Sequence, residues 1–347
     1  MLNTSAAARR LIATVLSAVL ACAFVSAVAA KPVAIAVKGY DYYLSGSAAD
    51  LKPAAPALSS VVLMGGGPDV DAAFKFMIDR APGGDFVVIR VSGADGYNPY
   101  IYAMGNLDSV ETLVIKTREA ASDPFVLERM AQADALFIAG GDQSDYIRLW
   151  KGTPLDAKIQ ELQNRRVPIG GTSAGLAVLG AFDYTGAAGS VTSAEALGNP
   201  YHRRMTLDRY FLTGAGLGGV IADAHLDARD RMGRLLTFVA RIVQDKSVTT
   251  DAARGIGVDV ETALLIEGDV ATRAGLGSVY FLRPSVAPLV CKSGTPLTFR
   301  SVGVQRLSGA GSFKLSTWTG PINAVTSYWI AAETGVLTSS QPGGSPY

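Results

Sequence analysis

Five short apolar runs in the first half of the chain predict strands that are buried on both faces. Helical stretches at 70–80, 123–132 and 155–164 lie between them. Apolar strands that alternate with helices are typical of a parallel sheet built from strand–helix–strand units. Glycine follows several of the strands, and sites in such sheets form at the carboxyl edge. The runs are Val61–Met64, Phe86–Val91, Leu113–Ile115, Ala135–Ala139 and Val167–Ile169.

The pattern changes after residue 270. Val279–Pro284, Leu297–Phe299 and Ser312–Leu315 alternate between apolar and polar residues and are separated by Gly, Ser and Pro, which predicts added antiparallel strands. We therefore expect an α/β catalytic domain with a mainly parallel sheet over 31–270 and a β-rich extension of its core over 271–338. The remaining residues, 339–347, have the composition of a disordered tail.

Residues 1–30 have the pattern of an export signal. Arg9 and Arg10 precede an apolar run, and small residues follow up to Ala30. We expect cleavage after Ala29 or Ala30, a periplasmic or extracellular protein, and no integral membrane span in the mature chain. Cys22 stands in a poor lipoprotein motif, so a lipid anchor is not favoured.

The charge balance argues against a nucleic-acid partner. The chain has 31 basic and 30 acidic residues, and removal of the signal leaves 29 basic ones (31 − 2). A near-neutral chain has no basic excess for binding phosphate backbones. With 2 cysteines and 2 histidines, a metal-ligand cluster is not expected. Gly65-Gly66-Gly67 lacks the Lys-Ser/Thr of a phosphate-binding loop, so the sequence predicts no cofactor.

A candidate nucleophile lies where an apolar strand runs into a helix pattern. The sequence Gly171-Thr172-Ser173-Ala174-Gly175 has the Gly-x-Ser-x-Gly form of a nucleophile elbow. Such a turn exposes the serine beside the free N–H groups of the new helix, where an oxyanion would form. Ser173 is therefore a candidate for acyl transfer, provided that a base lies nearby.

The chain has two histidines to serve as that base. His202 lies in a polar, turn-like stretch and is expected on the surface, whereas His225 ends an apolar strand. Spacing does not choose the carboxylate that would orient the base. Asp223 alternates with His225, and Glu195 also fits the cap of a helix start. The acidic residues between Ser173 and His225 are Asp183, Glu195, Asp208 and Asp223.

Four stretches together resemble the serine peptidase family that contains cyanophycinase and the bacterial aspartyl dipeptidase. They are Gly140–Gln143, Gly170–Gly175, Asp223–Arg234 and Gly255–Ala263, and the resemblance covers roughly residues 60–270. The third stretch is the most specific, because it has the Asp, His, three Arg and Gly of the family's motif in the same order.

The resemblance implies a class I glutamine amidotransferase-like fold, a homodimer, and a serine exopeptidase that releases β-Asp-Arg dipeptides from cyanophycin. That polymer is a polyaspartate whose side chains carry arginine. The resemblance also implies roles for particular residues: Ser173, His225 and Glu195 as the catalytic triad, Gly141 and Ala174 as oxyanion donors, and Gln143, Asp223, Arg229, Arg231 and Arg234 in substrate binding.

The residues by themselves leave alternatives open. The three arginines precede or open a predicted helix at 232–243, where they could hold a substrate carboxylate or pair with Asp227 and Asp230. An aspartyl or isoaspartyl dipeptidase would share most of the site. A Gly-x-Ser-x-Gly esterase would need a His-Gly-Gly stretch and a histidine near its C-terminus, and neither is present. A non-catalytic binding protein that kept the pocket is the alternative outside enzymes.

Overall fold

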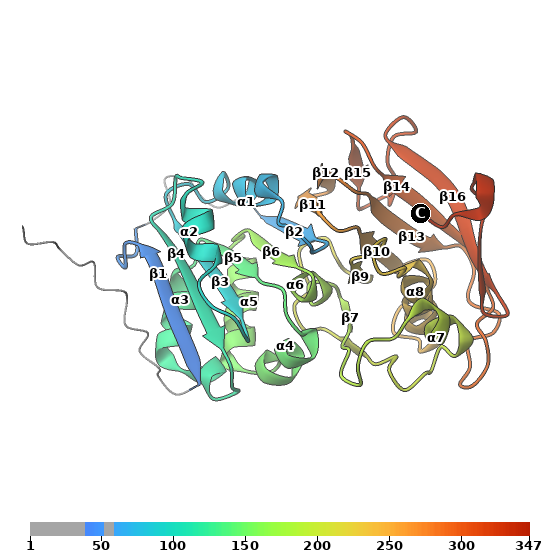
Figure 1. Cartoon of the computed structure of the whole chain (residues 1–347), viewed down its shortest axis with the longest axis horizontal. Coiled ribbons are helices and arrows are strands. Elements are labelled where there is room, and N and C mark those ends of the chain that lie inside the picture. The colour runs from blue at the N-terminus through green and yellow to red at the C-terminus, as the bar shows by residue number, and fades with distance from the viewer. Residues whose placement is uncertain (1–38, 52–58) are drawn as a thin grey trace, which may run out of the picture. The chain divides into compact units, whose positions relative to one another are not determined.

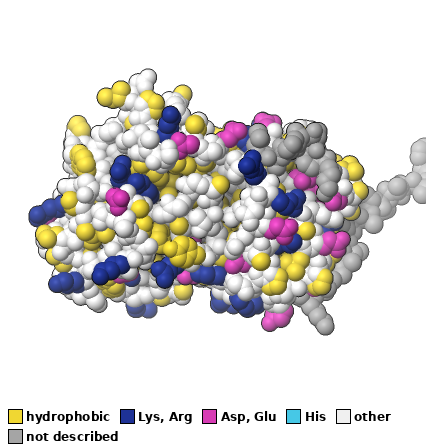
Figure 2. Space-filling model, turned by 180° about the vertical axis from the view of Figure 1, so that it is seen from behind, with side chains coloured by type: hydrophobic (Ala, Val, Ile, Leu, Met, Phe, Trp, Pro, Cys, Tyr) yellow, Lys and Arg dark blue, Asp and Glu magenta, His cyan; other side chains and the backbone are white. Residues whose placement is uncertain are grey.

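A computed structural model of the chain describes residues 39–51 and 59–347. The predicted signal peptide, its cleavage site and Cys22 lie outside the described residues. No helix within the described ranges is long and apolar enough to span a bilayer. Figure 2 shows that one face of the molecule carries both basic and acidic side chains.

The first sheet has nine strands in the order β1-β4-β3-β5-β6-β2-β11-β12-β15 (Figure 1). Its centre, from β4 to β2, is parallel, and β1, β11, β12 and β15 add antiparallel pairs on the two sides. The strands are β1 (Tyr40–Gly46), β2 (Ser60–Met64), β3 (Asp85–Arg90), β4 (Ser109–Ile115), β5 (Ala135–Ile138), β6 (Ile169–Thr172), β11 (Thr262–Glu267), β12 (Val270–Gly275) and β15 (Ser312–Lys314).

The second sheet has eight strands in the order β17-β16-β14-β13-β10-β9-β7-β8. Only the β10–β9 and β9–β7 pairs are parallel. The strands are β7 (Phe182–Tyr184), β8 (Leu207–Arg209), β9 (Val220–Ala224), β10 (Arg254–Val258), β13 (Val279–Pro284), β14 (Phe299–Leu307), β16 (Val325–Glu333) and β17 (Val336–Ser339).

Helices cover both faces of the first sheet because its central strands are apolar on both faces. α1 (Asp71–Ile78) and α2 (Tyr97–Tyr102) pack on one face. α3 (Pro124–Gln132), α4 (Gln143–Trp150) and α5 (Pro154–Asn164) pack on the other. Asp123 and Thr153 cap α3 and α5, and each of these helices has proline in its first turn, as expected at a helix start.

One face of the second sheet is covered by α7 (Ser193–Gly198) and α8 (Met232–Gln244). The other face contributes Val279, Phe281 and Leu307 to the same core that lies under α3–α5. α6 (Ala174–Ala177) is a single turn after β6, and two short 3₁₀ turns occupy Ala120–Ser122 and Pro342–Gly344.

The α/β prediction is confirmed, but both sheets are mixed, so a mainly parallel sheet describes only the β4-to-β2 region. The antiparallel part begins before residue 270, because β11 already pairs antiparallel with β2. The described residues form one compact unit that runs through this boundary. The narrower likeness to class I glutamine amidotransferases stays a prediction.

The expectation of a disordered tail after residue 338 is wrong. Tyr347 packs edge-on against Tyr280, and its hydroxyl donates to Asp230 Oδ1 at 2.8 Å and accepts from the backbone N–H of Met232 at 3.1 Å. Composition suggested disorder, but one aromatic side chain anchors the segment to the start of α8.

Candidate active site

Ser173 occupies the tight turn between β6 and α6, in a backbone conformation that L-residues rarely adopt. Its φ is 52° and its ψ is −109°. Such strain costs about 1–3 kcal/mol and persists only where the surroundings enforce it. Here the enforcement comes from close backbone packing. A Cβ on Gly171 would lie 2.4 Å from the Gly175 carbonyl oxygen, and one on Gly175 would lie 2.0 Å from that of Ile138. The two glycines of the motif are therefore needed for the turn itself.

His225 follows β9 and meets the serine across the end of β2. Its Nε2 lies 2.8 Å from Ser173 Oγ. Two backbone bonds join the three loops, because Ser173 N–H donates to Met64 and His225 N–H donates to Gly65. The predicted nucleophile and base are thus brought together in hydrogen-bonding geometry. The other histidine, His202, lies in a turn, where its Nδ1 accepts from the Arg204 N–H at 3.3 Å.

The ring of His225 packs closely against Gly66. A Cβ built on Gly66 would lie 2.4 Å from the ring's Cε1 and 2.5 Å from its Nε2. The ring therefore fits only because residue 66 has no side chain. Within the described residues, the one hydrogen bond of the imidazole is that to Ser173. Its position rests on packing and on its backbone bond to Gly65.

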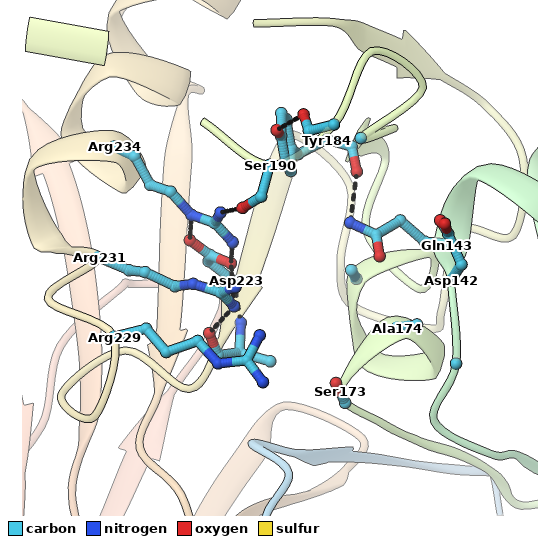
Figure 3. A pocket seen from close by; sticks show the side chains of 15 residues that line it. Asp142, Gln143, Ser173, Ala174, Tyr184, Ser190, Asp223, Arg229, Arg231 and Arg234 are labelled. Atoms are coloured by element: carbon cyan, nitrogen blue, oxygen red, sulfur yellow. Dashed lines mark hydrogen bonds and ion pairs between the residues drawn. The ribbon is translucent and has the colours of Figure 1, made fainter. Parts of the chain in front are cut away.

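Beside Ser173 lies a cavity of about 230 Å³. Figure 3 shows Arg229, Arg231, Arg234 and Asp223 on one wall, with Gln143 and Asp142 across from them and Ser173 below. Gly141 and Ala174, the expected oxyanion donors, line the same cavity, and Gly140 packs beside Ser173. Gln143 donates from Nε2 to the Tyr184 carbonyl at 3.3 Å. All the predicted substrate-binding residues therefore lie around one cavity.

The three arginines have different surroundings. Arg234 is buried and bidentate to Asp223, with Nε–Oδ2 and Nη2–Oδ1 distances of 2.7 and 2.6 Å. Arg231 donates to the Ala224 carbonyl at 2.7 Å, and its guanidinium lies 3.7 Å from Asp223. Arg229 is exposed and has no ion pair or hydrogen bond from its guanidinium within the described residues.

These contacts revise two expectations. Asp223 and Arg234 neutralise each other in an ion pair, so they form part of the cavity wall and do not bind a ligand through their charges. Among the three arginines, Arg229 has the guanidinium that is available to a ligand. The alternative in which Asp227 and Asp230 neutralise the arginines is wrong. Asp227 accepts from the Val260 N–H instead, and Asp230 accepts from Tyr347.

The electrostatics of the cavity keep the histidine neutral. Burial, followed by the positive charges of Arg229 and Arg231, lowers the pKa of His225 from 6.5 to about 4. The neutral imidazole is the form that accepts a proton from a serine hydroxyl, so the histidine is ready to act as a base at neutral pH.

The structure places Glu195 away from the imidazole. It is the third residue of α7, where Oε2 accepts from the Thr192 N–H at 3.0 Å and Oε1 pairs with Arg204 at 2.8 Å. This is a capping box, the alternative that its sequence context allowed. The geometry gives no support for Glu195 as the third member of a triad.

None of the other acidic candidates contacts the imidazole in the described structure. Asp223 pairs with Arg234, and Asp208 pairs with Lys151 at 2.7 Å. Asp183 is fully buried, and neither of its oxygens has a hydrogen-bond partner among the described residues. Burial raises the pKa of Asp183 well above its usual range, which favours the neutral acid.

Sequence reasoning missed Tyr184 and Ser190, which also line the cavity. The Tyr184 hydroxyl donates to the Gly189 carbonyl at 2.9 Å and accepts from the Val191 N–H at 2.8 Å, and so holds the loop that carries Ser190. Ser190 Oγ in turn accepts from Arg234 at 3.1 Å. No local signal marks either residue. Asp142 was overlooked although it adjoins the Gly140-Gly141 pair.

The sequence profile of peptidase family S51 matches residues 100–198, which include Gly141, Gln143 and Ser173. The cyanophycinase of Trichormus variabilis is 29% identical over 215 residues, or 60% of this chain and 66% of the relative. That of Synechococcus elongatus is 30% identical over 178 residues, or 50% and 49%. The chain is therefore similar to peptidase family S51 and to cyanophycinases.

The matches cover 66% and 49% of those two cyanophycinases, so the chain spans only part of the length of its relatives. Among solved structures, a peptidase from an acI-B1 Actinobacterium is similar at 18% identity and a TM-score of 0.49, and the match covers 75% of this chain and 98% of that one.

Proposed function

We propose that this chain is a serine-type exopeptidase that hydrolyses the backbone aspartyl linkages of cyanophycin and releases β-Asp-Arg dipeptides. The observation that carries the proposal is the 2.8 Å contact between Ser173 Oγ and His225 Nε2. It lies at the edge of a cavity lined by Arg229, whose guanidinium has no partner among the described residues. The match to the S51 profile and the similarity to cyanophycinases support the same reaction class. Export through the N-terminal signal is part of the proposal.

The reaction begins when neutral His225 accepts the proton of Ser173 Oγ as the oxygen attacks the scissile carbonyl. The backbone N–H groups of Gly141 and Ala174 stabilise the oxyanion, and the imidazolium then gives its proton to the leaving amine. Water, deprotonated by His225, hydrolyses the acyl-enzyme. In this scheme a Ser–His pair performs the proton transfers, and packing against Gly66 takes the place of an orienting carboxylate.

Arg229 and Asp142, on opposite walls of the cavity, can bind the charged groups of the proposed substrate. In each β-Asp-Arg unit of the polymer the arginine keeps a free α-carboxylate, which Arg229 can bind with two parallel hydrogen bonds. Asp142 lines the other wall and has no ion pair within the described residues, although its Oδ1 caps the Ser144 N–H. Asp142 is therefore available to a substrate guanidinium.

An aspartyl or isoaspartyl dipeptidase is the second candidate. The observation that favours it is the small size of the cavity, about 230 Å³, which suits a ligand of one or two residues. The two functions differ in whether the enzyme cleaves the polymer. The esterase alternative has no support from the residues around Ser173.

The test is incubation of the protein without residues 1–30 with insoluble cyanophycin and, separately, with α- and β-aspartyl dipeptides, followed by mass spectrometry. We expect β-Asp-Arg from the polymer, and Ser173→Ala should reduce the rate by roughly three orders of magnitude or more. Release only from dipeptides would favour the second candidate. Full activity of the folded Ser173→Ala protein would refute the serine mechanism.

A further inference from the structure

The second sheet has an open face that no step of the proposed reaction uses. One face of β13, β14 and β16 packs under α8, and the opposite face is covered at one end by Phe313 and Trp318. Beyond that cover lies a recess of about 670 Å³, which shares no lining residue with the cavity at Ser173.

The floor of the recess is made of cross-strand rows. Arg283, Gly303 and Trp329 are paired across β13, β14 and β16, and Phe281, Gln305 and Ser327 form the next row. Paired residues on neighbouring strands lie on the same face, so these side chains share one surface.

Trp329 forms a flat platform on this surface. Gly303 has no side chain, and the indole lies over it, with ring carbons 3.6 and 3.8 Å from where a Cβ would stand. Trp329 is nevertheless 52% exposed. A large aromatic side chain that is supported from below and open above is suited to stacking against a planar or apolar group.

Charged groups lie beside this platform. Arg283 is exposed and its guanidinium makes no hydrogen bond or ion pair within the described residues, and Asp251 also lines the recess. A neutral ligand would leave the Arg283 guanidinium unused, and a purely cationic one would be repelled by it. The surface therefore complements a ligand that carries a carboxylate together with a flat cationic group.

We propose that the Trp329–Arg283 recess is a second, non-catalytic binding site for the polymer substrate. Resting on the proposed function, the site binds a β-Asp-Arg repeat through its carboxylate at Arg283 and its guanidinium over the Trp329 indole. It holds the enzyme on an insoluble particle while chain ends reach Ser173. Two weak sites on one molecule raise the local concentration of substrate without changing the chemistry of either.

The experiment measures binding separately from cleavage. Protein with Ser173→Ala, which leaves the polymer intact, is sedimented with cyanophycin granules, alone and with Trp329→Ala or Arg283→Gln added. We expect each added change to weaken binding by roughly three- to thirtyfold, the scale of one stacked or charge-assisted contact. Trp329→Tyr should restore most of the binding, and Tyr210→Ala, which removes an exposed aromatic elsewhere, is the matched control.

In the catalytically active protein, which retains Ser173, Trp329→Ala should slow the release of dipeptides from granules. It should leave kcat/KM on a soluble β-Asp-Arg oligomer unchanged. The proposal is overturned if the Ser173→Ala protein does not sediment with granules, or if the added changes leave sedimentation unaltered. Two control measurements could also overturn the proposal. One is that Trp329→Ala and Arg283→Gln abolish binding to an acidic polysaccharide but not to cyanophycin. The other is that light scattering shows these changes only convert a dimer into a monomer. Trp329-dependent binding without any cleavage would instead refute the proposed function and leave this site standing.

Discussion

Replacing Gly66 by alanine tests whether packing, in place of a carboxylate, holds the catalytic histidine. The new Cβ would lie 2.4 Å from Cε1 and 2.5 Å from Nε2 of His225. Carbon atoms in contact prefer about 3.5–4.0 Å, so the ring must retreat by about 1 Å. A retreat of that size stretches the 2.8 Å bond to Ser173 Oγ beyond hydrogen-bonding distance.

The expected result is a loss of roughly two to four orders of magnitude in kcat/KM, because general-base assistance is removed and the reacting atoms are misplaced. Gly66 has φ +89°, so alanine also adds backbone strain of about 1–2 kcal/mol. Gly105→Ala is the matched control. Its φ is +83°, but no atom lies within 4 Å of the added Cβ, so it shares the strain and lacks the clash.

The assay is hydrolysis of a soluble β-Asp-Arg oligomer, together with the rate at which a fluorophosphonate labels Ser173. The labelling rate reports serine activation without substrate binding. Both rates should fall for Gly66→Ala and stay near the parent value for Gly105→Ala, while the two variants lose similar stability in thermal unfolding. A folded Gly66→Ala protein that reacts within about threefold of the parent in both assays would refute the reasoning.

Three further predictions follow from the contacts around the cavity. Glu195→Gln should change kcat/KM by less than about threefold and lower Tm only slightly, because it removes the ion pair with Arg204 while glutamine can still cap the helix. A severe loss in kcat, measured alongside thermal melting, would restore Glu195 to the triad. Arg229→Lys should lower kcat/KM by roughly one to three orders of magnitude without changing Tm. Arg234→Lys should instead lower Tm, because it disrupts the buried pair with Asp223. Equal Tm values for the two variants would contradict the assignment of Arg229 to the ligand and Arg234 to the structure. The acid limb of the kcat/KM profile should lie near the His225 pKa of about 4, and it should move to higher pH in Arg229→Gln because removing a nearby cation favours the imidazolium. Stability should also fall as pH drops from 6.5 towards 4, because the unfolded state binds the proton at its ordinary pKa of 6.5. An acid limb near pH 6.5 in the unmodified protein would show that the imidazole is not buried as described.

Local pattern predicted the elements that depend on neighbours in sequence. The apolar runs predicted the central strands to within a few residues, and the helical stretches predicted at 70–80, 123–132 and 155–164 correspond to α1, α3 and α5. The Gly-x-Ser-x-Gly motif predicted the turn at Ser173 because its steric requirement is local: two glycines must let β6, α6 and β5 approach.

Local pattern was least reliable where several partners compete for one charged or aromatic group. Asp223, Glu195 and Asp230 each stand near plausible partners in sequence, yet their actual partners are Arg234, Arg204 and Tyr347. Residues 339–347 are a further example. Their composition favours disorder, yet Tyr347 anchors them through contacts with Tyr280 and Asp230, which are distant along the chain.

What the sequence by itself determined is therefore the α/β core, the strained serine and the histidine most suited to assist it. Tertiary structure alone decided that Gly66 packs against the imidazole and that Trp329 is exposed above Gly303. It also decided that Asp223 neutralises Arg234, while Arg229 has no partner within the described part of the chain. The reason is physical. Secondary structure and tight turns depend on dihedral preferences and periodicity within a few residues, whereas the partner of a charge or the cover of a ring depends on packing between segments distant along the chain.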